Sequence, residues 1–137
     1  MTPRYAELAA TTNFSFLRGA SHPEELVATA MALGLAGVGI ADRNSLAGVV
    51  RAHSFAKTNQ IAADFRLAIG ARLVFCDGTP DILSFPRDRA AYGRLTRLLT
   101  RGNARAQKGA CLLRLGDLLE FAQGPQLIVM PAGTWDA

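Results

Sequence analysis

The chain has 137 residues, of which 50% are hydrophobic and 19% are charged, and its formal net charge is +4. This length suffices for one domain with a hydrophobic core, and the composition excludes a disordered or fibrous protein. No apolar run reaches the 18 residues of a membrane span, and the N-terminus lacks the apolar segment of a secretion signal. We therefore expect one cytoplasmic domain, or a domain fragment, over residues 1–137.

Neither the two cysteines nor the net charge points to one class of function. Cys76 and Cys111 are far apart and have no C-x-x-C spacing, so a disulfide is allowed by number alone. In a cytoplasmic chain we expect both thiols to be reduced. The mild basic bias fits a solvated surface about as well as it fits nucleic-acid binding.

Helix and strand signals alternate in the first half of the chain. Ser21 and Glu24 have the spacing of a capping box, which predicts a helix that runs to Gly34. The apolar run 35–41 predicts a short strand. Asn44 then offers an N-cap for a second helix that reaches about residue 58.

The alternation continues in the second half. Residues 65–75 predict one bent strand or two short ones, and residues 81–85 predict another strand. Residues 88–101 have the apolar spacing of an amphipathic helix. The remaining expected segments are a basic loop over 102–109, a strand over 112–115, a short helix over 116–122 and a last strand over 126–131. Such alternation favours a parallel α/β layer or barrel with right-handed crossovers.

Several segments carry a family resemblance. Residues 5–26, which read YAELAATTNFSFLRGASHPEEL, and residues 36–42, which read AGVGIAD, resemble the N-terminal PHP (polymerase and histidinol phosphatase) domain of bacterial DNA polymerase III alpha subunits. The resemblance is closest to the error-prone subgroup, and residues 92–102 and 108–109 extend it to the whole chain. It implies an α/β fold that is part, about the first half, of a distorted (β/α)7 barrel.

The resemblance also implies a metal site, whose ligand positions hold other residues here. The family's His-x-His pair falls on Ala9 and Thr11, its Thr-Asp-His segment ends in Asp42 and Arg43, and the glutamate of its Ile-Gly-x-Glu segment is Arg72. One carboxylate cannot offset the desolvation of several ions, and arginines repel cations. We expect these five residues to be a remnant of the family site, with no metal and no catalytic residue.

Asp42 is the one ligand type that the remnant retains. Its position at the end of a predicted strand is where barrel enzymes place their chemistry, so a remnant ligand is one interpretation. The alternative, which we favour, is a carboxylate that pairs with Arg43 or Arg72, or that caps the helix beginning at Asn44.

Other candidate groups have structural interpretations. Glu7 precedes the lost His-x-His pair, and we expect an exposed or ion-paired carboxylate there. His22 and His53 lack a second ligand at helical spacing. Ser15 and Ser21 lack a nucleophile elbow, and Ser21 is expected to be an N-cap.

Cationic residues gather between Arg87 and Lys108, where Asp88 is the only acid. Such a strip could follow a phosphate backbone, although only Tyr92 is there to stack on bases. We favour a solvated helix face or a docking surface for the rest of a polymerase. Nucleic-acid or partner contacts, if made, would fall on Arg94, Arg97, Arg101, Arg105 and Lys108.

The resemblance implies a degenerate, non-catalytic PHP domain with a structural role in an error-prone polymerase, which acts in DNA replication, DNA repair and translesion synthesis. The acidic triad, fingers and thumb of a polymerase are absent, so the chain alone does not copy DNA, and the parent's DNA and Mg²⁺ would be bound elsewhere. The expected partners are the rest of the polymerase core and, through it, DNA, with no membrane. Two alternatives stay open: a metal-dependent phosphoesterase that recruits Glu7, Asp42 and His53, and a small basic nucleic-acid-binding module.

A half-length barrel leaves a strand edge without its neighbour. Residues 112–115 and 126–131 are the likeliest edges, since they come last in the chain. We therefore expect self-association through an unclosed barrel edge, or marginal stability.

Overall fold

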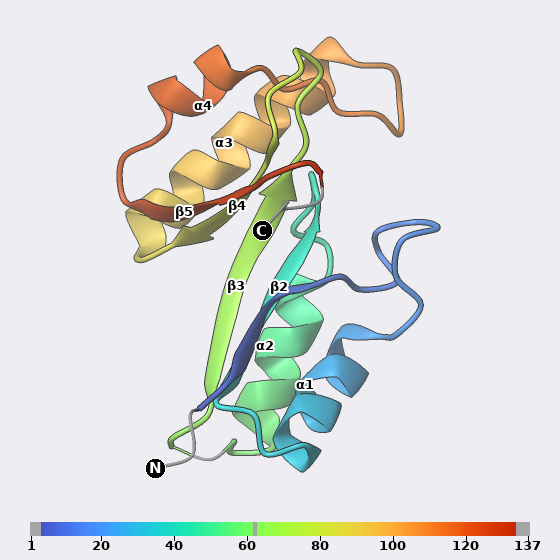
Figure 1. Cartoon of the computed structure of the whole chain (residues 1–137), viewed down its shortest axis with the longest axis vertical. Helices are drawn as coiled ribbons and strands as arrows, with labels where there is room; N and C mark the ends of the chain where they lie inside the picture. The colour runs from blue at the N-terminus through green and yellow to red at the C-terminus, as the bar shows by residue number, and fades with distance from the viewer. Residues whose placement is uncertain (1–3, 62, 134–137) are drawn as a thin grey trace. The chain divides into compact units, whose positions relative to one another are not determined.

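A computed structural model describes residues 4–61 and 63–133 (Figure 1). The chain divides into two compact units, Met1–Ala71 and Arg72–Ala137, and the division falls inside a strand. The units are described one at a time. Among the described residues, no helix is both long and apolar enough to cross a membrane.

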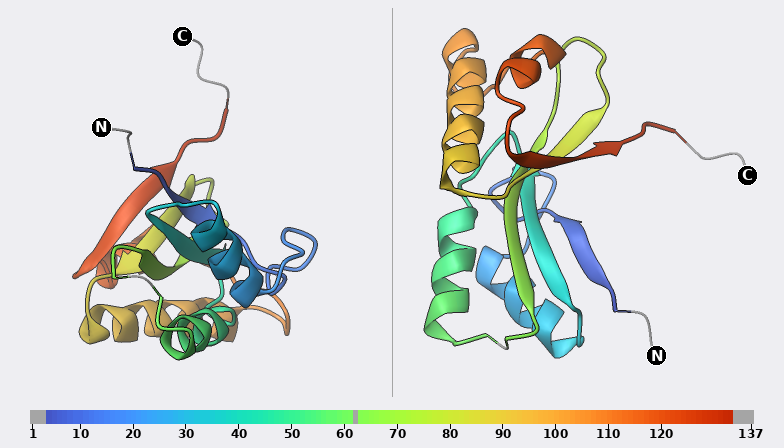
Figure 2. Two further views of the ribbon diagram at one scale, coloured as in Figure 1. Left: turned by 90° about the horizontal axis from the view of Figure 1, so that it is seen from below. Right: turned by 90° about the vertical axis from the view of Figure 1, so that its left-hand side faces the viewer.

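The first unit is a parallel α/β arrangement. Its elements are β1 (Ala6–Ala10), α1 (Pro23–Ala32), β2 (Gly37–Arg43), α2 (Val49–Thr58) and β3 (Arg66–Leu73), whose last two residues belong to the second unit. The strands lie in the order β1, β2, β3, and β1 pairs with β2 in parallel. The helices α1 and α2 lie side by side on one face of these strands (Figures 1 and 2). This confirms the predicted alternation in this half of the chain.

The core of the first unit lies between that helix pair and the strands. Val27 and Ala30 of α1, Val38 and Ile40 of β2, and Ala52 of α2 are all buried in one apolar cluster. Because β2 is covered by a helix layer and flanked by two strands, its residues from 37 to 42 are buried without the alternation of a one-sided strand.

Two predicted helix starts in this unit were wrong. The N-cap of α1 is His22, whose N–H donates to the Glu25 carboxylate at 2.8 Å, so the capping signal lies one residue beyond Ser21. The start of α2 is Val49 instead of a residue after Asn44. Asn44 has a φ of +47°, whereas an N-cap has an extended backbone, so Asn44 turns the chain at the end of β2.

The second unit consists of two antiparallel strands and the two helices that lie between them in the sequence. Its elements are β4 (Asp81–Pro86), α3 (Arg89–Arg105), α4 (Leu115–Glu120) and β5 (Pro125–Met130). Strand β5 runs antiparallel to β4, so the expectation of a parallel layer was wrong for this pair. The register sets Pro86 opposite Pro125, because α3 carries the chain away from the end of β4 and residues 106–124 bring it back.

The amphipathic helix of this unit is longer than predicted. The buried side chains of α3 include Ala91, Leu95 and Leu98, as the apolar spacing indicated, and Asp88 caps the helix by accepting from the Ala91 N–H at 2.7 Å. The helix continues to Arg105, so the first four residues of the predicted basic loop are helical.

Residues 112–115 do not form the strand predicted there. Leu113 makes a single β-bridge to Phe75, and its carbonyl accepts from the Cys76 N–H at 2.8 Å. Cys76 and Cys111 are both free thiols.

Candidate functional site

Asp42, at the end of β2, is the centre of a buried polar cluster. Its carboxylate has no solvent exposure. Oδ1 accepts hydrogen bonds from the Thr12 N–H at 2.8 Å and from the Ser15 hydroxyl at 2.7 Å, and Oδ2 accepts one from the Thr12 hydroxyl at 2.8 Å. A buried carboxylate requires such donors to replace its lost hydration. Neutral groups of the loop that follows β1 therefore hold this charge.

The donors are themselves tied to the backbone around them. The Ser15 hydroxyl oxygen accepts from the Arg43 N–H at 2.9 Å, and the Thr12 hydroxyl oxygen accepts from the Phe14 N–H at 3.1 Å. Gly48 approaches the cluster so closely that a Cβ atom there would lie 2.8 Å from Oδ2 of Asp42. The packing leaves no volume for an additional atom on that side.

The expected pairing of Asp42 with an arginine was wrong. Arg43 is exposed, and only its backbone N–H joins the cluster. Arg72 belongs to the second unit, where its Nε donates to Asp81 at 2.7 Å. Asp42 does not cap the helix predicted at Asn44 either, since α2 begins at Val49. The loop after β1 supplies donors at short range, and these satisfy both carboxylate oxygens.

The other two remnant positions of the first unit offer no ligand nitrogen. Ala9 carries a methyl group, and its N–H donates to the Glu7 carboxylate at 2.8 Å. The Thr11 hydroxyl donates to the Ala9 carbonyl at 3.5 Å. Glu7 also accepts from the Tyr5 hydroxyl at 2.7 Å. These hydrogen bonds, chiefly the one from Ala9, lower the pKa of Glu7, so its carboxylate is satisfied locally.

The alternative ligand set of Glu7, Asp42 and His53 does not assemble. Within residues 4–61 and 63–133, no three His, Cys, Asp or Glu side chains gather in a way that could hold a metal ion. The Nδ1 of His22 contacts the Asn13 amide at 3.1 Å. The residues described here therefore do not fit the metal centre that the resemblance implied.

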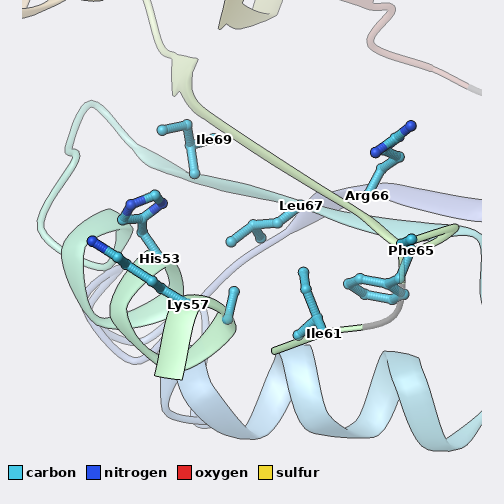
Figure 3. A pocket seen from close by; sticks show the side chains of 9 residues that line it. His53, Lys57, Ile61, Phe65, Arg66, Leu67 and Ile69 are labelled. Atoms are coloured by element: carbon cyan, nitrogen blue, oxygen red, sulfur yellow. The ribbon is translucent and has the colours of Figure 1, made fainter. Parts of the chain in front are cut away.

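His53 instead lines a pocket between α2 and β3 (Figure 3). His53 and Lys57 project from α2 beside an apolar floor that includes Leu67 and Ile69, while the Arg66 side chain points away from them. No carboxylate is among the described residues that line it. Among the described lining residues His53 is the only one of a type that binds metal, and one imidazole does not make a metal site.

The cationic strip of the second unit is largely engaged within that unit. Arg87 donates to the Gly124 carbonyl at 3.0 Å and Arg94 to the Gln123 carbonyl at 2.6 Å. Arg101 pairs with Glu120 at 2.7 Å and lies over the Phe121 ring. These contacts hold α3 to the segment that contains α4.

Arg105 binds a carboxylate that is largely buried. Its guanidinium binds Asp117 with two hydrogen bonds of 2.6 and 2.7 Å, and Asp117 also accepts from the Arg114 N–H. The paired arginine is the main cause that lowers the pKa of Asp117 to about 2. By contrast, Arg97 and Lys108 form no ion pair with another described residue.

The sequence interpretation missed two sets of residues. Thr12 and Ser15 could have been found from their three-residue spacing, since hydroxyl side chains at such spacing build loops by local hydrogen bonds. Asp117 had no local signal of its link to Arg105, because 12 residues and a change of direction separate the two.

Comparisons with known proteins identify the family. The family model described as "PHP domain" matches residues 7–126. The chain is 58% identical over 129 residues to an error-prone DNA polymerase of Rhodopseudomonas palustris (strain BisB5), and 57% identical over 134 residues to one of Caulobacter vibrioides. These matches cover 94% and 98% of this chain but 12% of each relative. The chain thus spans a small part of the curated relatives it matches.

A solved structure agrees on the fold. A proposed metal-dependent phosphoesterase from Bifidobacterium adolescentis superposes with a TM-score of 0.58 at 25% identity, over 74% of this chain and 34% of that one. The fold is accordingly α/β and PHP-like, and the five strands of the described residues are part of a PHP barrel. Together with the family match over residues 7–126, this establishes that the chain belongs to the PHP domain family.

Proposed function

We propose that this chain acts as a non-catalytic PHP domain with a structural role in an error-prone DNA polymerase. Residues 1–137 would then be one PHP-like domain, or a fragment of one, because the family match runs across both units from residue 7 to residue 126. The identity to error-prone DNA polymerases over more than nine-tenths of the chain supports this parentage.

One observation carries the non-catalytic part of the proposal. Asp42 is the only remaining ligand type of the family site, and both of its oxygens are bound by Thr12 and Ser15 in a place without solvent exposure. A metal ion would have to displace these donors and bring further ligands, which Ala9 and Thr11 cannot supply. The carboxylate that would bind metal shapes a loop instead.

The partners follow from the parentage. The relatives extend far beyond the matched segment, and the rest of such a polymerase would be the surface against which this domain packs. DNA, nucleotides and Mg²⁺ would be handled by that remainder, in replication and damage-tolerant repair in the cytoplasm. The domain would contribute stability and position, not chemistry.

Metal content is the direct test. The purified chain and the Asp42→Asn variant are each equilibrated with Mn²⁺, Zn²⁺ or Fe²⁺, desalted and measured by elemental analysis, and hydrolysis of bis-p-nitrophenyl phosphate is followed in parallel. We expect no stoichiometric metal and no hydrolysis. About one or more ions per chain, lost in Asp42→Asn but kept in the exposed control Asp64→Asn, would overturn the proposal.

We also propose that any nucleic-acid contact of the cationic strip falls on Arg97 and Lys108. Arg94, Arg101 and Arg105 are engaged within the second unit, whereas Arg97 and Lys108 are exposed and form no ion pair with another described residue. Anisotropy of a labelled DNA duplex across a salt series tests this. Loss of binding in Arg97→Glu and Lys108→Glu, with a smaller salt slope, supports it, and unchanged binding in both variants contradicts it.

Self-association through β5 is a further part of the proposal. Leu127, Ile128 and Val129 are all exposed, and β5 comes last in the strand order. An edge strand with apolar side chains on both faces favours pairing with a second chain. Light scattering of the wild-type chain and of Ile128→Lys over a wide concentration range should show association in the first and a smaller species in the second. A monomeric wild-type chain at all concentrations would contradict it.

A further inference from the structure

The loop between β1 and α1 presents a patch of apolar side chains to solvent. Phe16 and Leu17 are 84% and 87% exposed, and Phe14 is 42% exposed. We call these three residues the apolar tip. In Figure 1 the loop that carries it, drawn in blue, extends away from α1 and from the strands of the first unit. Two consecutive large apolar residues with so much exposure are unusual on a surface that faces only water.

The loop below the apolar tip is closed by hydrogen bonds. The Asn13 N–H donates to the Ser21 carbonyl at 2.9 Å, and the N–H groups of Arg18 and Gly19 donate to the Ser15 carbonyl at 2.9 and 3.1 Å. The Ser15 hydroxyl is fixed to Asp42. The backbone of this loop is therefore already ordered in the folded chain. A partner that binds the apolar tip does not have to order it, and this lowers the entropic cost of binding.

Leu17 adds backbone strain at the most exposed position. Its φ is +59°, in the left-handed region that residues other than glycine and asparagine seldom adopt. The turn that Ser15 closes through its carbonyl forces this conformation. Strain that persists at a solvent-exposed apolar residue is typical of a contact site.

The exposed charged side chains next to the apolar tip are positive, because Asp42, the carboxylate that this loop binds, is buried. Arg18 follows the tip in the chain, and Arg43, whose N–H binds Ser15, is also exposed. Residues 8–22 contain no Asp or Glu. A complementary surface would thus be an apolar cleft with carboxylates at its rim.

A protein fits this chemistry better than a nucleic acid does. Phe16 has a ring on which a base could stack, but Leu17 beside it, the most exposed member of the tip, has none. Two nearby arginines are few for a surface that follows a phosphate backbone.

We propose that the apolar tip docks into an acid-rimmed apolar cleft on the polymerase body that lies outside the matched segment of the relatives. This rests on the proposed structural role and names the surface through which it is exerted. The matched segment is 12% of the Rhodopseudomonas palustris polymerase, so most of that protein is available to supply the cleft.

The experiment places this chain in a complete polymerase. The matching segment of the Rhodopseudomonas palustris enzyme is replaced by this chain, and the photo-crosslinker p-benzoylphenylalanine is introduced at position 16. Position 33 is the matched control, because Leu33 is 70% exposed at the end of α1 and carries no such framework. Position 128 samples the exposed strand β5. Crosslinked peptides are identified by mass spectrometry with and without primer-template DNA.

We expect position 16 to crosslink to the polymerase body, within a segment rich in apolar and acidic residues, in several-fold higher yield than position 33. The double variant Phe16→Ser, Leu17→Ser should expose the junction to protease, whereas Leu33→Ser should not. Crosslinks from position 16 to DNA, to a second copy, or to nothing would overturn the inference.

The controls separate this inference from the proposed function. Crosslinks to the body from position 128 alone would leave the structural role standing and remove the apolar tip as its surface. Absence of crosslinks to the body from all three positions would contradict both.

Discussion

Among the described residues each unit buries one aspartate, and the hydrogen-bond donors of the two carboxylates differ in charge. Asp42 in the first unit is bound by a backbone N–H and two hydroxyl groups, and no arginine side chain is among its hydrogen-bond partners. Asp117 in the second unit accepts hydrogen bonds from Nη1 and Nη2 of Arg105, and Nη1 of Arg101 lies 3.7 Å away. The exposed fractions are 0% and 7%, so burial alone does not explain the difference.

The comparison shows what each carboxylate is used for. At Asp42 the donors come from one short loop, and satisfying the charge fixes that loop and the apolar tip on it. At Asp117 the donor comes from Arg105, the last residue of α3, and this pair connects α4 to the end of that helix. The neutral donors fix the shape of a loop, whereas the charged pair connects two helices.

Removing the carboxylate of Asp42 should have the largest effect. Asp42→Ala leaves the Thr12 N–H and the hydroxyls of Thr12 and Ser15 without their acceptor inside a buried space. We expect a loss of roughly 3–5 kcal/mol in the free energy of unfolding, since each unsatisfied buried donor is costly. Urea denaturation followed by circular dichroism measures it.

A matched control is Asp64→Ala. The Asp64 side chain is 77% exposed and its partner Arg4 is 64% exposed, so we expect a change within about 0.5 kcal/mol. If Asp42→Ala unfolds at the same urea concentration as Asp64→Ala, the buried cluster does not hold the loop.

Adding one methyl group beside the same cluster should cost less. In Gly48→Ala the new Cβ would lie 2.8 Å from Oδ2 of Asp42 and 3.0 Å from Oγ1 of Thr12. We expect a loss of roughly 1–3 kcal/mol from overpacking. The counterpart in the second unit is Gly93→Ala, in the interior of α3 with nothing within 4 Å, which should raise stability by about 0.5–1 kcal/mol. If the two variants unfold at the same urea concentration, the structure around Gly48 shifts to accept the added methyl group and the overpacking argument is wrong.

These particular residues also show how far the sequence could be read. The elements of the first unit could be predicted because helix and strand periods alternate there, and the family motifs located Asp42 at a strand end. The hydrogen-bond donors of Asp42 were not predicted correctly. An arginine was expected, but Arg72 pairs with Asp81, which lies nine residues away in the sequence. The sequence shows which residue types occur at the site, but which donor binds the carboxylate depends on which groups the fold brings next to it.

The second unit was harder for a related reason. Nothing local distinguished the helical part of the predicted basic loop from a true loop, since Asn103 and Gly102 are weak helix formers. Tertiary contacts of Arg101 and Arg105 with the α4 segment override that propensity. The antiparallel course of β5 likewise depends on how residues 106–124 return the chain.

The pH dependence of the stability should report the pair of Asp117 with Arg105. The pKa of Asp117 is about 2 in the folded chain and 3.8 without the fold, so its stabilisation is present above about pH 4 and is lost as the pH falls towards 2. We expect roughly 1–2 kcal/mol to disappear over this window after allowance for solvent screening. Thermal unfolding from pH 5 to pH 2 measures it.

The Asp117→Asn variant should not show this loss of stability between pH 4 and pH 2, because the amide does not titrate. The exposed strip residue Arg97 serves as the control, and Arg97→Ala should keep the wild-type pH profile. An Asp117→Asn profile parallel to wild type between pH 4 and pH 2 would mean that the pair with Arg105 adds no stability.

The smallest effect should come from Arg72, at one of the remnant positions. Its ion pair with Asp81 joins side chains that are 36% and 25% exposed, and water screens such a pair. Arg72→Ala should therefore cost less than about 1 kcal/mol, far below Asp42→Ala, and Asp81→Ala should match it. A double-mutant cycle at low and high salt isolates the coupling, which should shrink with salt. If Arg72→Ala instead lowers stability as much as Asp42→Ala does, Arg72 supports the buried carboxylate after all, and the division of labour between neutral and charged donors fails.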